Sequence, residues 1–207
     1  MQQLTDRVWW ITEAVGAHCY LIDHPDGLVL IDPGMSLGLN RVARALHASG
    51  RSPRAVSHLL LTHYDADHAQ VAAEWQRRTG AGVWLGAADA AILTGAAAIP
   101  TGFRRLMGGV LGLPELPGGL HLVEGRDEIL PGIEAIPTPG HTPGHLVFTS
   151  ADVVFLGDSA MVTSQGALTP LPPFLNCDPV AVQTSLAVVE DLDVAWRCAG
   201  HSAPRRR

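Results

Sequence analysis

The chain has 207 residues, 47% of them hydrophobic, and its formal net charge is −6 at pH 7. This length is sufficient for one well-buried domain, and the acidic balance argues against nucleic acid as a partner. Met1 leads directly into polar residues and no run of about eighteen apolar residues occurs, so we expect neither a secretory signal nor a membrane span. The three cysteines lack paired spacing, which fits reduced residues in a cytoplasmic protein.

The N-terminal part of the chain predicts three strands and a helix. Apolar runs at 8–12, 17–23 and 28–32 are typical of hairpin strands. In residues 39–49 the apolar side chains recur at helical spacing, and Ser52-Pro53 marks the end of this segment. Strands followed by helices favour an α/β fold.

A cluster of metal-competent side chains follows the next apolar strand, 57–61. Residues 63–68 read His-Tyr-Asp-Ala-Asp-His. Carboxylates crowded this closely repel each other and lose solvation unless a cation compensates them. A divalent metal is the simplest compensation, because imidazole nitrogen and carboxylate oxygen are its usual ligands. In the alternative interpretation, Asp65 or Asp67 only caps a helix predicted over 68–78.

The segment 87–119 lies between predicted strands at 83–85 and 120–123, and its sequence allows two interpretations. Much of it has a helical pattern that is broken by glycine and proline. It is either a helical layer packed on the core or an apolar helical lid over the active site. Arg104 and Arg105 could contact an anionic group, but adjacent arginines on a helix are usually solvated.

Three further ligand candidates follow rigid turns or apolar strands. His141 lies in a Pro- and Gly-rich loop between strands predicted at 133–136 and 146–149, and Asp158 follows an apolar strand at 153–156. His201 follows another apolar run, 194–199. Strand ends are where α/β proteins place chemistry, because the strands are rigid and the loops are free.

The stretch between these candidates predicts a pocket wall and a helix. Residues 161–177 include a stiff apolar Leu-Pro-Pro-Phe-Leu sequence that could form a further wall of the pocket. A last helix is predicted at 179–191, because Pro179 suits the first helical turn.

The order of these motifs resembles the metallo-β-lactamase fold superfamily over nearly the whole chain. The signature of that family, His-x-His-x-Asp-His, corresponds here to His63-Tyr64-Asp65-Ala66-Asp67-His68. The resemblance implies one metallo-β-lactamase-like domain over residues 1–207, an αββα sandwich of four layers with metals at one edge.

The resemblance also implies two adjacent metal sites. The first would comprise His63, Asp65 and His141, and the second would comprise Asp67, His68 and His201. Asp158 would bridge the two ions, with a water or hydroxide between them as the nucleophile. Asp67 would additionally act in catalysis by orienting that nucleophile or moving its proton. Asp32 would hold the ligand loop in place.

The chain departs from the family pattern at Asp65, where the signature has a second histidine. A carboxylate is shorter, harder and negatively charged, and two histidines with one carboxylate suit iron or manganese as well as zinc. We therefore expect two divalent ions, with zinc first and Mn²⁺ or Fe²⁺ as alternatives. Asp65 could also bind through a water, which would leave the first site weaker.

These features predict a metal-dependent hydrolase that attacks an ester, thioester, lactone or phosphoester bond of a small molecule. The alternatives are an iron-dependent oxidoreductase on the same fold and a non-catalytic metal-binding protein. The expected partner is a small-molecule substrate, with no nucleic acid and no membrane, and the sequence leaves a homodimer open.

Overall fold

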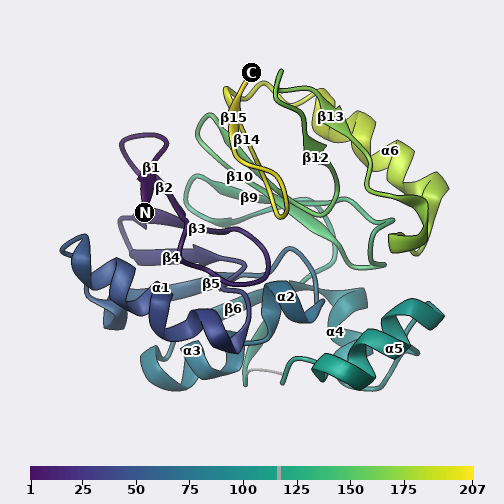
Figure 1. The fold of residues 1–207 in the computed structure, drawn as a ribbon, viewed down its shortest axis with the longest axis horizontal. Helices are drawn as coiled ribbons and strands as arrows, with labels where there is room; N and C mark the ends of the chain where they lie inside the picture. Colours follow the sequence, from purple (N-terminus) through teal and green to yellow (C-terminus); the bar gives the residue numbers. More distant parts are fainter. Residues whose placement is uncertain (116–117) are drawn as a thin grey trace.

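Two β-sheets lie face to face between layers of helices in the computed structural model, which describes residues 1–115 and 118–207 (Figure 1). The first sheet has seven strands in chain order: β1 (Gln2–Gln3), β2 (Val8–Ile11), β3 (Cys19–His24), β4 (Gly27–Ile31), β5 (Val56–Leu60), β6 (Gly82–Gly86) and β7 (Leu120–Val123). The second has six, in the spatial order β15 (Arg205–Arg206), β14 (Trp196–Ala199), β11 (Val153–Gly157), β10 (Leu146–Ser150), β9 (Ile133–Pro137) and β8 (Asp127–Leu130). A short hairpin joins β12 (Met161–Val162) to β13 (Leu168–Thr169).

Parallel pairing in both sheets determines where the loops gather. Strands β4, β5, β6 and β7 pair in parallel in the first sheet, and β11 pairs in parallel with β14 in the second. The carboxyl ends of parallel strands meet at one edge of a sheet. The segments that follow β5, β11 and β14 therefore lie at the same edge of the sandwich.

The helices form the outer layers. They are α1 (Ser36–Ala48), α2 (Ala66–Ala69), α3 (Ala72–Thr79), α4 (Ala87–Leu93), α5 (Gly102–Leu111) and α6 (Pro179–Glu190), with two single 3₁₀ turns at Pro53–Ala55 and Pro173–Leu175. Asp178 caps α6 by accepting from the backbone N–H groups of Val180 and Ala181, and Pro179 occupies the first turn, as predicted.

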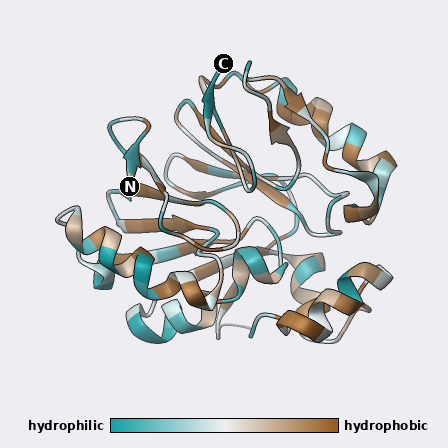
Figure 2. Cartoon of the chain, viewed as in Figure 1, coloured by the Kyte–Doolittle hydropathy of each residue, from teal (hydrophilic) through white to brown (hydrophobic). Residues whose placement is uncertain are grey.

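Three buried apolar clusters confirm the four αββα layers. Leu46 of α1 and Trp75 of α3 pack on the first sheet, whereas Tyr20 and Phe148 lie between the two sheets. Val189 of α6 belongs to a third cluster on the outer face of the second sheet. Figure 2 shows the corresponding apolar colouring along the central strands.

The single helix predicted over 68–78 is wrong, because the chain forms α2 and α3 with a break between them. The N–H of Gly34 donates to the carbonyl of His68 at 2.8 Å, and the N–H of Val71 donates to the carbonyl of Gly34 at 3.2 Å. The break therefore arises because a distant loop takes backbone hydrogen bonds that a continuous helix would use itself.

The two helices within 87–119 differ in burial, and α4 packs on the core as the first interpretation expects. Ala90 and Ile92 of α4 are buried, and Ala90 belongs to the core beneath the first sheet. In α5 the one buried residue is Arg104, and Leu106 is 65% exposed. Residues 116–117 of this segment lie outside the described part of the chain. Within the described ranges, no helix is long and apolar enough to cross a membrane.

Candidate metal centre

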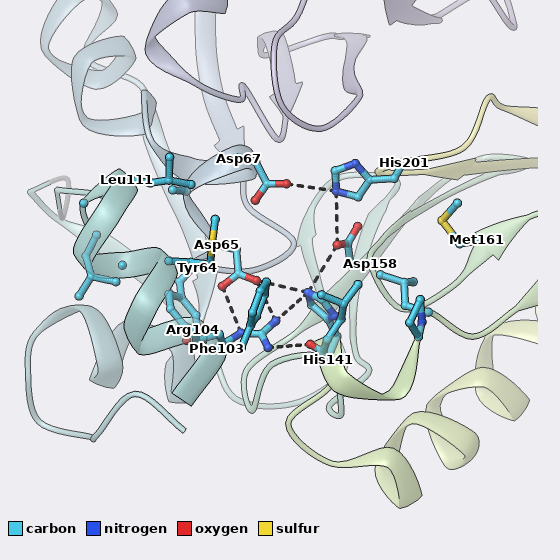
Figure 3. A pocket seen from close by; sticks show the side chains of 18 residues that line it. Tyr64, Asp65, Asp67, Phe103, Arg104, Leu111, His141, Asp158, Met161 and His201 are labelled. Atoms are coloured by element: carbon cyan, nitrogen blue, oxygen red, sulfur yellow. Dashed lines mark hydrogen bonds and ion pairs between the residues drawn. The ribbon is translucent and has the colours of Figure 1, made fainter. Parts of the chain in front are cut away.

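Loops from both sheets bring all seven predicted ligands to one edge of the sandwich. His63 lies just beyond β5. Asp65 immediately precedes α2, and Asp67 and His68 lie within α2. His141 follows β9, Asp158 follows β11 and His201 follows β14. Figure 3 shows side chains from these separate loops pointing toward one another.

The seven side chains form three overlapping groups with the spacing of metal ligands. The groups are His63/Asp65/His141, Asp67/His68/His201 and His63/His68/Asp158, and in each the ligand atoms lie within 4.8 Å of one another. We call the first two groups site 1 and site 2.

Asp158 lies between site 1 and site 2. Its Oδ2 atom is 3.4 Å from Nε2 of His141 and 3.5 Å from Nε2 of His201, and its Oδ1 atom is 3.4 Å from Nε2 of His68. This placement is the one expected of a carboxylate that would contact ions on both sides.

Two buried imidazoles each carry a ring nitrogen without a hydrogen-bond partner among the described residues. These atoms are Nε2 of His63 and Nε2 of His68. Nδ1 of His68 is 2.8 Å from Oδ2 of Asp32 and Nδ1 of His63 is 3.0 Å from Oγ1 of Thr62, so the opposite ring nitrogen is free in each case. Buried polar atoms are rarely left unpaired, and free Nε2 atoms beside carboxylates fit a divalent metal.

Asp32 holds the ligand loop in the way the sequence predicted. Its Oδ1 atom accepts from the N–H of Thr62 at 2.8 Å, and its Oδ2 atom accepts from Thr62 Oγ1 at 2.7 Å. The backbone of Asp32 has φ of 49°, an unusual value for a residue other than glycine. This strained position is typical of a residue that a functional site requires.

Gly200 lets the loop before His201 approach the cluster closely. A Cβ atom at this position would lie 2.7 Å from Cε1 of His68 and would also collide with the Asp158 carboxylate. A side chain at position 200 would therefore displace two ligand candidates.

His145 positions the backbone of the central carboxylate. Its Nε2 atom accepts from the N–H of Asp158 at 3.1 Å, and its Nδ1 atom is 2.9 Å from Oγ1 of Thr138. Burial lowers the pKa of His145 well below its usual value, so the ring is neutral and suited to this hydrogen bond.

The capping interpretation of Asp65 is wrong. Asp65 does precede α2, but its side chain makes no hydrogen bond to the helix. Its Oδ1 atom accepts from Nε of Arg104 at 3.2 Å and its Oδ2 atom accepts from Nη2 at 2.8 Å. This two-pronged pair is the strongest form of an arginine–carboxylate contact.

The expectation that both arginines of α5 are solvated holds for Arg105 and is wrong for Arg104. Arg105 is exposed and donates to the carbonyl of Ile99, whereas Arg104 is only 4% exposed and lies against site 1. The missed signal is helical spacing, because residues 104, 107, 108 and 111 share one face and line the same pocket. An arginine on an otherwise apolar helix face indicates a buried anionic partner.

The electrostatics of the cluster keep its carboxylates ionised. Burial opposes ionisation of Asp67, but the charge of His68 and the interaction with His201 lower the pKa of Asp67 to about 2. The interactions with Asp158 and Asp67 raise the pKa of His201 to about 9. A divalent ion at site 2 would take the place of the protons that these histidines hold.

An apolar cavity of about 530 Å³ opens directly onto the cluster. Residues of α5 form one wall, and Met161, Leu171, Pro172 and Leu175 form another, as predicted for 161–177. Phe103 also lines the cavity, and its ring meets the ring of Phe174 edge to face with centroids 6.1 Å apart. The cavity therefore suits a small apolar molecule with a polar reactive group facing the ligands.

Sequence reasoning also missed Asp89, a buried carboxylate that ties two ligand-bearing loops together. Its Oδ2 atom accepts from the N–H of Tyr64 and from Oγ1 of Thr142, and its Oδ1 atom accepts from the N–H of Gly144. Tyr64 and Thr142 each adjoin a ligand candidate, so Asp89 couples their two loops. No local pattern in the sequence marks this role.

Comparisons with known proteins agree with this geometry. The chain is 24% identical over 192 residues to the probable metallo-hydrolase YybB of Bacillus subtilis (strain 168), covering 90% of this chain and 81% of that protein. It is 31% identical over 151 residues to a hydroxyacylglutathione hydrolase of Fuscovulum blasticum, covering 69% of this chain and 47% of that protein. The di-iron-bound form of TTHA1623 superposes with a TM-score of 0.71 at 25% identity, covering 92% and 89% of the two chains. The sequence model of the Metallo-beta-lactamase superfamily matches residues 12–201, and the chain belongs to that superfamily.

Proposed function

We propose that this protein is a metal-dependent hydrolase of small apolar esters, thioesters or lactones. The observation that carries the proposal is the convergence of four histidines and three aspartates in one cluster, five members of which line an apolar cavity. The superfamily membership and the similarity to a probable metallo-hydrolase support hydrolysis as the reaction class. We further propose that the site takes zinc, with manganese or iron as alternatives, and that the protein is cytoplasmic and a single domain.

The residues of the cluster would have two different roles, metal binding and proton transfer. His63, His141, His68 and His201 would bind metal through Nε2, and Asp158 would contact both sites. A bound divalent ion would lower the pKa of a water and polarise the carbonyl of the substrate. Asp67 is a third exposed, and its Oδ2 atom lies 3.1 Å from His201, so it faces the cavity and can hold or accept a proton there. It is our candidate for the general base.

The cavity lining supports a carbonyl substrate over a phosphoester. The lining is mostly apolar, and the one arginine among the described lining residues, Arg104, is already paired with Asp65. Apart from bound metal, a phosphate group would therefore find no free arginine in the lining to bind it. The hydrolase from Fuscovulum blasticum matches over part of its length and supports the thioester or ester class.

The test is a substrate panel on protein purified without chelator. We expect hydrolysis of aryl esters and thioesters to exceed hydrolysis of an aryl phosphodiester, and to fall by about 10²–10⁴-fold in Asp67→Ala. Asp6→Ala is the matched control, because Asp6 is exposed in a turn outside the site. A metal-loaded protein that cleaves none of these substrates would instead favour a non-catalytic metal-binding role.

One observation favours a second candidate, an iron-dependent oxidoreductase. Site 1 has two histidines and one carboxylate, a ligand set that suits iron, and the TTHA1623 structure is in a di-iron form. Iron in the purified protein, with a visible absorption band and oxygen uptake, would support this function. Zinc in the protein with full hydrolytic activity would exclude it.

A further inference from the structure

The guanidinium of Arg104 occupies the part of the cluster that an ion at site 1 would use. Its Nη2 atom is 2.8 Å from Oδ2 of Asp65 and 2.8 Å from Nε2 of His141. Its Nη1 atom donates to the carbonyl of Leu175 at 2.7 Å, which fixes the plane of the group. Arg104 thus makes four polar contacts, and two of its partners are site 1 ligand candidates.

The contact with His141 and coordination of a metal exclude each other. Nδ1 of His141 lies 3.3 Å from Oδ1 of Asn176, so the ring proton is on Nδ1 and Nε2 carries the lone pair. An imidazole nitrogen has one lone pair in the ring plane. When Nε2 accepts from Arg104, that lone pair cannot bind an ion.

The charges lead to the same conclusion. Three carboxylates enter the cluster, those of Asp65, Asp67 and Asp158, and Arg104 supplies one positive charge. One divalent ion at site 2 then brings the sum of these charges to zero. A second ion at site 1 would place two further positive charges against the retained guanidinium of Arg104, and this repulsion is unfavourable.

We propose that Arg104 is an internal cation that takes the place of the site 1 metal. The chain then binds one ion tightly at site 2, and a second ion enters site 1 only when the guanidinium withdraws. The inference rests on the metal chemistry of the proposed function. It also distinguishes this chain from an arrangement with two equivalent ions, because the competing cation is part of the chain.

The test is a metal-binding titration by equilibrium dialysis, with zinc and manganese per chain measured by mass spectrometry. In the unaltered protein we expect one tight ion and one weaker ion. Arg104→Met removes the charge and keeps an unbranched apolar stem, so the second ion should bind about ten- to a hundredfold more tightly. Arg105→Met is the matched control on the same helix and should bind like the unaltered protein.

Two further measurements keep the proposal testable if Arg104→Met does not fold. Arg104→Lys retains a charge but loses the planar fork, so it should bind the second ion with intermediate affinity. In the unaltered protein, an arginine-selective dicarbonyl reagent should modify Arg104 slowly without metal and faster once a second ion binds, with Arg105 unchanged. Constant protection of Arg104 with two ions bound would overturn the proposal.

The outcomes separate this inference from the proposed function. Two ions of equal affinity in the unaltered protein, or no gain in Arg104→Met, would overturn the inference and leave a hydrolase in place. Absence of any metal binding in all variants would overturn both.

Discussion

Site 1 and site 2 differ in what already surrounds their ligands. At site 1 both oxygens of Asp65 and the Nε2 atom of His141 are engaged by a buried arginine. At site 2 the histidines form ion pairs only with carboxylates among the described residues, and His201 is 36% exposed at the cavity. Site 1 is therefore occupied by a cation of the chain, whereas site 2 is not.

The comparison shows how one substitution in a signature changes the partners of a site. A carboxylate at position 65 offers two acceptor oxygens, which match the two N–H groups of a guanidinium. A histidine there would offer one nitrogen and no charge. Position 65 and position 104 therefore have to be considered together.

The largest effect is expected at the residue that the two sites share. Asp158→Ala should abolish binding at site 1 and site 2 and lower ester hydrolysis by about 10²–10³-fold or more, because it contacts ligands of both. Metal analysis and ester turnover on one preparation measure this. Asp152→Ala, at the opposite end of the same strand, is the control and should retain both properties. Full metal content in Asp158→Ala would contradict the shared role.

Substitution of Asp65 tests whether the ion pair between Asp65 and Arg104 makes the two sites differ. Asp65→His leaves Arg104 buried without its carboxylate, so the free energy of unfolding should fall by about 2–3 kcal/mol. Asp65→His combined with Arg104→Met should recover stability and bind two ions. Denaturant unfolding and metal content provide the double-mutant cycle. Strictly additive effects would mean that the pair does not couple the sites.

The apolar wall of α5 is expected to determine which sizes of substrate bind, without affecting metal binding. Met107 lines the cavity, whereas Leu106 points outward and is 65% exposed. Met107→Ser should raise KM for long-chain aryl esters by about tenfold, with little effect on acetate esters. Leu106→Ser on the same helix is the control. Equal effects of the two changes would contradict a substrate-contacting wall.

The smallest effect is a pH dependence of stability in chelator-treated protein. The pKa of His201 is raised from 6.5 to about 9 in the folded state, first through Asp158 and then through Asp67. The folded state thus holds this proton more tightly. Its stabilisation is complete below about pH 6.5 and is lost as pH rises through about 9.

Thermal unfolding between about pH 6 and 10 measures this loss. The partial exposure of His201 keeps the change small. The control is chelator-treated His201→Gln, which should lack the part of the pH dependence of stability that His201 contributes. A rise in stability over the same pH range would contradict the assignment.

The sequence alone predicted the ligand candidates and most of the longer strands along the chain. Each ligand candidate follows a short apolar strand or a rigid turn, so its position is encoded locally in residues such as those of β5 and β11. Parallel pairing then gathers the ends of these strands at one edge. The four αββα layers are what the family resemblance implied, and the structure confirms them.

Only the tertiary structure decided the break between α2 and α3 and the place of Arg104. The break depends on hydrogen bonds from Gly34, and the arginine pairs with a residue 39 positions away. Local spacing places Arg104 on an apolar helix face but does not identify its partner, because the fold brings that partner close from a distant part of the chain. The sequence thus specified which groups could bind metal, and long-range packing specified which of them already hold a cation.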